Sequence, residues 1–181
     1  MSENRENRIA EPANVEAEQN YLAACLLDHE IVELYPVETG QFYLMKNQWM
    51  HAAIKNAAGG DAISVAAELE RAGHAEAWGG VMGVVNLQCS VVSVAIGASC
   101  ARLIREASAQ REIIKTGSDI VQRAYAREDP ELLVAEGIRS LEGTERVAGE
   151  VNRAADGAMS VLAKALRYQS EPLTNGDVRG I

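Results

Sequence analysis

The sequence predicts an all-α protein in which a compact multi-helix head domain is followed by a protruding antiparallel helical hairpin and a linker helix. Three observations predict this class. Short apolar stretches with helical spacing, several of them ended by Gly or Pro, fill the first hundred residues. Two longer apolar stripes follow, separated only by a short turn, which favours an antiparallel pair of helices. A last short amphipathic stretch stands near the C-terminus.

The first helix is expected to begin after Asn14, whose side chain can accept a hydrogen bond from an unpaired amide of the first turn. Glu16 and Glu18 place negative charge near the positive end of the helix dipole. Residues 1–11 are polar and charged, which is typical of a disordered tail and unlike a signal peptide.

Residues 12–105 are expected to form the compact head domain. A short apolar patch ends at Pro36. Apolar residues spaced three and four apart between Met50 and Ala57 form one face of a helix that Gly59-Gly60 ends. Ser64 is expected to cap a further helix, and another short helix should follow the next pair of glycines.

Residues 106–148 are expected to form the hairpin. Asp129-Pro130-Glu131 supplies an N-cap, a proline at the first helical position and an acid in the first turn of the second helix. Two helices alone have too little surface to bury both apolar stripes, so the stripes need a partner. We expect the oligomer interface to consist of Ile113, Ile114, Ile120, Val121, Val134, Ile138 and Leu141.

Pairing of two such hairpins would give a four-helix bundle and a dimer, which three-fold repetition could close into a hexamer as a trimer of dimers. The alternative is that the hairpin folds back onto its own head and hides the stripe within a monomer.

Residues 149–181 are expected to be a linker with one short amphipathic helix, leading to an ATPase domain that is absent from this chain. The apolar face of that helix has no evident place to pack within the chain. Its expected docking face consists of Val161, Leu162, Ala165 and Leu166.

The net charge of -9, from 17 basic and 26 acidic residues, argues against autonomous DNA binding because an acidic surface repels phosphate.

The three cysteines Cys25, Cys89 and Cys100 show no paired spacing and stand among apolar residues, which indicates reduced thiols and a cytoplasmic location. Residues 77–101 carry no charge, but their polar residues and glycines favour two short buried helices over a membrane span.

Residues that could carry chemistry do not form a recognisable site. There is no phosphate-binding loop, since the glycine-rich stretch at residues 79–83 has no lysine and suits a helix entry. The three histidines, His29, His51 and His74, have no zinc-motif spacing and are expected to be exposed or partly buried. We therefore expect no catalytic residue, metal site or cofactor in this chain.

Two further residue sets have structural interpretations. The arginines Arg102, Arg105 and Arg111 are expected mostly to form a solvated face, with a smaller chance of contacting an acidic partner. Trp49 and Trp78 are expected to fill the core or the spaces between helices.

Several segments together resemble one known family. Residues 12–19 read Pro-Ala-Asn-Val-Glu-Ala-Glu-Gln, and a Phe42-Tyr43 pair, the Asp-x-x-Ser…Leu-x-x-x-Gly pattern of residues 61–73, the double glycine and the helix from Ala101 follow in order. This order resembles the N-terminal domain, hairpin and linker of DnaB-type hexameric replicative DNA helicases. Three positions depart from the family pattern: Gln41 replaces an acid, Asn47 a common histidine, and His51 an aromatic residue.

The resemblance implies a non-catalytic oligomerisation and partner-docking domain for DNA replication, which forms the collar of a hexameric ring and docks primase and a helicase loader. It implies contact with DNA only through partners, and it assigns ATP and Mg²⁺ to the missing motor domain of an ATP-dependent helicase. A stand-alone helical adaptor or inhibitor of a replicative helicase, and a small all-α enzyme with an unrecognised site, remain alternatives.

Overall fold

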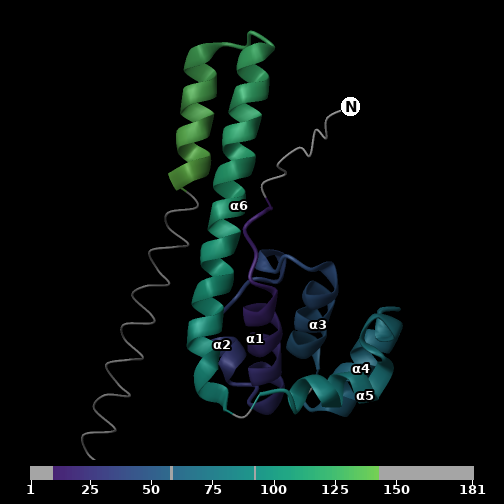
Figure 1. The fold of residues 1–181 in the computed structure, drawn as a ribbon. Helices are drawn as coiled ribbons and strands as arrows, with labels where there is room; N and C mark the ends of the chain where they lie inside the picture. The colour runs from purple at the N-terminus through teal and green to yellow at the C-terminus, as the bar shows by residue number, and fades with distance from the viewer. Residues whose placement is uncertain (1–9, 58, 92, 143–181) are drawn as a thin grey trace, which may run out of the picture.

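The computed structural model describes residues 10–57, 59–91 and 93–142. Within these residues every regular element is a helix, and no strand occurs. The prediction of an all-α fold is therefore confirmed. Figure 1 shows a head of short helices, from which the long helix α6 rises and pairs at its upper end with the helix of residues 130–142.

The head is built around its first helix. The elements of the head, in chain order, are α1 (Val15–Leu27), α2 (Ile31–Leu34), η1 (Thr39–Gln41), α3 (Met45–Asn56), α4 (Ala62–Arg71), η2 (Ala75–Trp78), α5 (Gly80–Gln88) and η3 (Val94–Ile96). Helix α1 contacts α3, α5 and α6, and it is buried on nearly all sides from Tyr21 to Leu26. A helix that is apolar all round is typical of a core position, and α1 is the centre of the head.

Local capping starts two of these helices. The Asn14 side chain accepts a hydrogen bond of 3.0 Å from the Ala17 amide, which confirms the predicted start of α1. The prediction for the fourth helix was wrong, because Asp61 and not Ser64 caps α4. The Asp61 carboxylate accepts the Ile63 and Ser64 amides at 3.0 and 3.1 Å, and the Ser64 hydroxyl donates to the same carboxylate.

Helix α6 (Gly97–Tyr125) is continuous through the expected boundary between head and hairpin at residues 105 and 106. Its first half packs on α1, with Ile104 and Ala107 buried, and its second half carries the hairpin. The stretch of residues 77–101 that lacks charge is divided between η2, α5, η3 and the start of α6. No described helix combines the length and the apolar composition needed to cross a bilayer.

The glycine-rich stretch of residues 79–83 has a structural role. Gly79 has a φ of 71°, in the left-handed region, and ends η2. A side chain at Gly83 would collide with the Trp78 carbonyl, since its Cβ would lie 1.3 Å from that oxygen. These glycines allow a tight entry into α5, as the sequence predicted.

Candidate interaction surfaces

The two helices of the hairpin meet through a small set of side chains. Ile120 lies against Gly137, where an added Cβ would come within 2.7 Å of the Ile120 Cδ1 atom. Leu133 is buried between the helices, and the hydroxyls of Thr116 and Ser140 form a hydrogen bond of 3.0 Å. The second helix begins as predicted, with the Asp129 carboxylate accepting the Glu131 amide at 2.9 Å.

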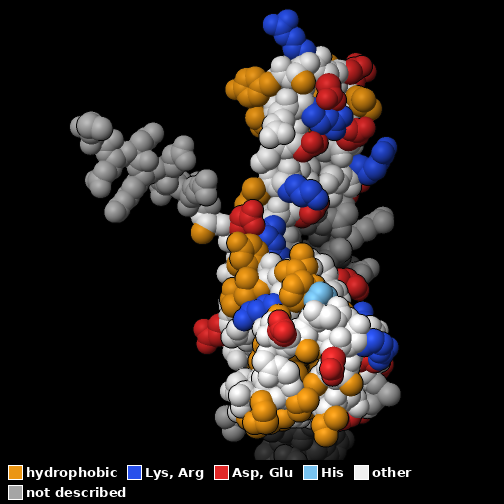
Figure 2. Space-filling view, turned by 90° about the vertical axis from the view of Figure 1, so that its right-hand side faces the viewer, with side chains coloured by type: hydrophobic (Ala, Val, Ile, Leu, Met, Phe, Trp, Pro, Cys, Tyr) orange, Lys and Arg blue, Asp and Glu red, His pale blue; other side chains and the backbone are white. Residues whose placement is uncertain are grey.

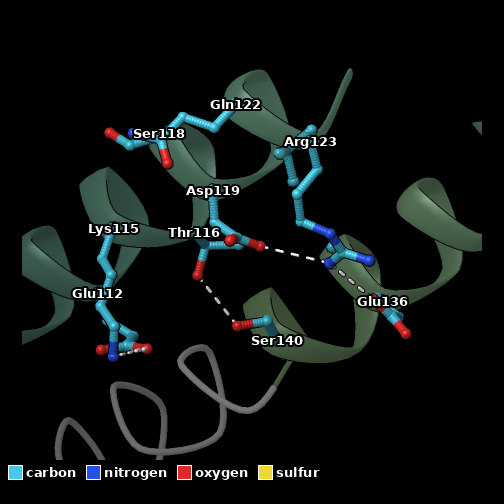
Figure 3. Close-up of a pocket in the computed structure, with 11 residues that line it drawn as sticks. Glu112, Lys115, Thr116, Ser118, Asp119, Gln122, Arg123, Glu136 and Ser140 are labelled. Carbon is cyan, nitrogen blue, oxygen red and sulfur yellow. Dashed lines mark hydrogen bonds and ion pairs between the residues drawn. The ribbon is translucent and has the colours of Figure 1, made fainter. Parts of the chain in front are cut away.

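One side of the hairpin is polar and hollowed. Figure 3 shows Arg123 directed at the second helix, where its guanidinium contacts Glu136 at 2.8 Å and also pairs with Glu128 at 2.9 Å and Asp119 at 3.4 Å. The Glu136 carboxylate, with help from Glu128 and Asp119, raises the pKa of Arg123 above its ordinary value. The open cavity beside it has a volume of about 570 Å³, and the residues that line it include Glu112, Lys115, Ser118, Asp119, Ile120, Gln122 and Ser140.

The groups on this polar face are paired with one another. Lys115 lies 3.7 Å from Glu112 on the same helix, and Arg123 already has three carboxylate partners. The described residues contain no group of three or more His, Cys, Asp or Glu side chains placed to hold a metal ion. The pairs that join the two helices, Arg123 with Glu136 and Thr116 with Ser140, brace them against each other.

The other side of the hairpin is apolar. Each residue is turned about 100° from the previous one around the helix axis, so its angle from the line along which the two helices touch can be counted from the sequence. In an antiparallel pair, residues at the same angle from that line lie on the same side of the hairpin. By this geometry the predicted interface residues fall on one side, opposite the charged lining of the cavity, except that Ile120 lies near the contact line and also lines the cavity. We call this set the apolar face: Ile113, Ile114, Ile120, Val121, Val134, Ile138 and Leu141.

Six members of the apolar face are between 41% and 61% exposed, and Ile120 is the exception because it turns inward against Gly137. A shallow groove on the second helix continues the face and is lined by Pro130, Glu131, Val134, Ala135 and Ile138. Figure 2 shows hydrophobic side chains at the surface near the top of the hairpin and over the head. The other predicted docking face, Val161, Leu162, Ala165 and Leu166, lies outside the described residues.

Two arginines of α6 fasten the hairpin helix to the head, and here the prediction of a solvated face was wrong. Arg111 donates to the Pro12 carbonyl at 2.8 Å and to the Gln41 carbonyl at 2.6 Å, and its guanidinium lies 5.6 Å from the centre of the Tyr43 ring. Arg105 is 7% exposed and donates to the Pro36 carbonyl at 2.8 Å. Burial lowers the pKa of Arg105. Arg102 does lie at the surface, paired with Glu106.

A buried carboxylate joins α1 to the start of α3. Glu18 is 2% exposed and accepts hydrogen bonds from the Tyr43 amide at 2.5 Å and from the Asn47 side chain at 2.6 Å. The Leu44 amide approaches the same carboxylate at 3.4 Å. Since Leu44 is the N-cap residue of α3 and has no capping side chain, Glu18 supplies the cap from another helix. The sequence pointed only to a role at the start of α1.

The histidines differ in their surroundings. His51 is fully buried, contrary to prediction, with its Nδ1 2.9 Å from the Thr39 hydroxyl and its ring 4.9 Å from that of Phe42. Burial lowers the pKa of His51 to about 4. His74 stacks on Trp49, with ring centres 3.9 Å apart. Trp49 and Trp78 pack against the core, as predicted.

Comparison with known proteins identifies what this arrangement is similar to. A family model described as DnaB-like helicase N terminal domain matches residues 10–106. The replicative DNA helicase DnaB of Mycobacterium leprae is 29% identical over 155 residues, which are 82% of this chain and 24% of that protein. The replicative DNA helicase DnaB of Geobacillus stearothermophilus is 35% identical over 137 residues, which are 71% of this chain and 30% of that protein.

A solved structure agrees with these matches. The crystal structure of the N-terminal domain of DnaB helicase from Mycobacterium tuberculosis covers 74% of this chain and 99% of its own, with a TM-score of 0.66 and 27% identity. About three quarters of the chain thus has the fold of that N-terminal domain, and the chain spans less than a third of the two curated helicases.

Proposed function

Because the chain belongs to the family of DnaB-like helicase N-terminal domains, we propose that it is a non-catalytic assembly and partner-docking domain of a replicative DNA helicase. The chain contains no phosphate-binding loop, so ATP hydrolysis belongs to a motor domain and not to this one. Within this function we assign self-association to the apolar face of the hairpin.

The observation that carries this proposal is the exposure of aliphatic side chains on one side of a two-helix projection. Burial of a whole Val, Leu or Ile side chain contributes roughly 1.5 to 3 kcal/mol, so covering the exposed half of one contributes about 1 kcal/mol. Six such side chains from each of two copies would contribute about 12 kcal/mol. Association costs on the order of 4 to 15 kcal/mol in lost freedom, so the two terms are comparable and the dimer should depend on concentration.

Higher assembly and partner docking extend the same proposal. Hairpin dimers that meet again through the heads would close into a hexameric collar as a trimer of dimers. Primase and a helicase loader are the proposed protein partners. The net charge of -9 supports contact with DNA through these partners and the motor domain, because an acidic surface repels phosphate.

The test introduces charge into the apolar face. Ile114 and Val121 are 49% and 55% exposed, so replacing both by Asp leaves the monomer intact. The variant should remain helical by circular dichroism, while its mass by light scattering falls toward that of the monomer because the buried carboxylates lack partners. Replacement of Ser118 and Gln122 by Asp, on the polar side of the same helix, is the control and should keep the wild-type mass. An unchanged mass for Ile114→Asp/Val121→Asp would show that the copies meet elsewhere.

A further inference from the structure

Gly117 occupies the centre of the part of the apolar face that lies on α6. Its neighbours on the helix surface are three and four residues away in each direction. These four residues are all large and aliphatic: Ile113, Ile114, Ile120 and Val121. Ile120 leans onto the second helix, so the depression left by the missing side chain at Gly117 is walled by the exposed side chains of Ile113, Ile114 and Val121.

Among the residues that the structure describes, no packing contact explains this glycine. Gly117 lies well within the 29-residue helix α6, where glycine is less favourable than alanine by about 1 kcal/mol. Apart from its chain neighbours and the adjacent backbone of α6, no heavy atom of the described residues lies within 4 Å of the position that its Cβ would occupy. Gly137 provides the contrast, because there Ile120 fills the space that a side chain would need. Gly117 is therefore open toward the outside, on the face that we assign to self-association.

We propose that Gly117 is the floor of a socket that receives an aliphatic side chain from the hairpin of a second copy. This inference rests on the proposed function and adds the point at which the two hairpins interlock. As in a coiled coil, where a side chain of one helix inserts between side chains of the facing helix, the occupant would insert between the neighbours of Gly117, but with the glycine itself as the floor. Exposed side chains of the right kind stand on the same face, at Val134, Ile138 and Leu141.

The chemistry around the socket selects an apolar occupant. Between residues 113 and 124, the positions on this side of α6 are the four aliphatic neighbours, Gly117 and Ala124, and none of them is charged. The charged residues of the same stretch, Lys115, Asp119 and Arg123, line the cavity on the opposite side. An acidic or basic segment would find no counter-charge at Gly117.

The size of the face suits a second copy. From Ile113 to Tyr125 the helix rises about 18 Å, and two helices side by side are about 20 Å wide, which gives a flat outline of about 360 Å². The accessible area of a ridged helix surface is larger than its outline, and it thus approaches the ~500 Å² per partner that is the lower limit for a specific interface. A two-fold symmetric contact uses the same patch on both copies, so sockets and projecting side chains are supplied in equal number.

The experiment replaces Gly117 by Leu in the full chain and compares association with stability. Leu adds apolar surface and favours the helix, so on an ordinary exposed face it would leave association unchanged or strengthen it. In a socket it excludes the incoming side chain. We expect the dissociation constant of the dimer, measured by sedimentation equilibrium, to rise at least tenfold, while the melting temperature of the dilute monomer stays the same or increases.

The control is Ser118→Leu, which adds the same side chain one position away on the polar side of α6 and should leave the dissociation constant within about twofold of wild type. Gly117→Ala adds a single methyl group to the socket and should give a smaller weakening in the same direction. It serves as the decisive variant if Gly117→Leu alters the circular dichroism spectrum. Association of both Gly117 variants as tight as wild type, or tighter, would overturn the socket.

The outcomes also separate the socket from the proposed function. If Ile114→Asp/Val121→Asp dissociates the dimer and the Gly117 variants do not, the apolar face is the interface and the socket is wrong. If the wild-type chain is monomeric at every concentration, or the Asp variant keeps its mass, the assignment of the face and the socket fail together.

Discussion

At the scale of single residues, the head depends on polar side chains that are buried and paired. The Glu18 carboxylate caps α3 from α1, and its partners are 25 to 29 residues away in the sequence. Replacing Glu18 by a residue that cannot accept these hydrogen bonds would cost about 1 to 3 kcal/mol. The donors would then be buried with neither water nor an acceptor. Glu18 therefore orients two helices that share no local sequence signal.

His51 makes the stability of the head dependent on pH. Its pKa is about 4 in the folded chain and about 6.5 when unfolded, so the unfolded chain binds the proton more readily. Stability is complete above pH 6.5 and decreases as the pH falls to about 4, by up to about 3 kcal/mol in total. Urea unfolding of wild type and of His51→Phe, measured at intervals between pH 7 and pH 4, should show this loss in wild type and a smaller loss in the variant.

Phenylalanine suits this position because His51 already packs against Phe42 and Tyr21, and Thr39 is only partly buried and can bond to water instead. Parallel curves for the two proteins over this range would contradict the assignment of the pH dependence to His51.

At the scale of elements, α6 connects two parts of the molecule. Its first half is bound to the head through apolar packing on α1 and through the carbonyl contacts of Arg105 and Arg111. Its second half presents the apolar face. Because the helix is continuous, contacts made by the head determine the direction in which the hairpin points.

Arg111→Ala tests this junction. The substitution removes two charge-assisted hydrogen bonds and a contact with the Tyr43 ring, and the partly exposed site reduces their contribution to roughly 1 to 3 kcal/mol in total. The free energy of unfolding in urea, measured below the concentration of association, should fall by that amount. Arg102→Ala, on the same helix, removes only a surface pair with Glu106 and should cost less than about 0.5 kcal/mol. Equal losses in the two variants would rule out a special role for the carbonyl contacts.

At the scale of the whole molecule, the sequence predicted features that depend on neighbours along the chain. The caps at Asn14 and Asp129 and the all-α class follow from local spacing and turn chemistry. Contacts between distant segments were not predictable in this way. An arginine on a helix has the same sequence pattern whether its guanidinium meets water or, as for Arg111, a carbonyl 99 residues away.

The candidate interface was predicted only in part for a related reason. The apolar stripe on α6 is wide enough for some of its residues to pack on the second helix while others face the solvent. The spacing of apolar residues in the sequence does not tell which residues do which. The structure directs Ile120 inward because Gly137 leaves room for it, and it leaves Ile114 and Val121 outside. A glycine opposite a large residue was the signal available in the sequence.

The measurement that most directly tests the central claim is hydroxyl-radical footprinting of the unmodified chain across a range of concentrations. If a second copy covers the apolar face, the reactivity of Ile114, Val121 and Ile138 should fall as the dimer forms. Ile63, which is 71% exposed on α4, should keep a constant reactivity as the reference on the head. Constant reactivity of the three hairpin residues, while light scattering reports a dimer, would contradict the account.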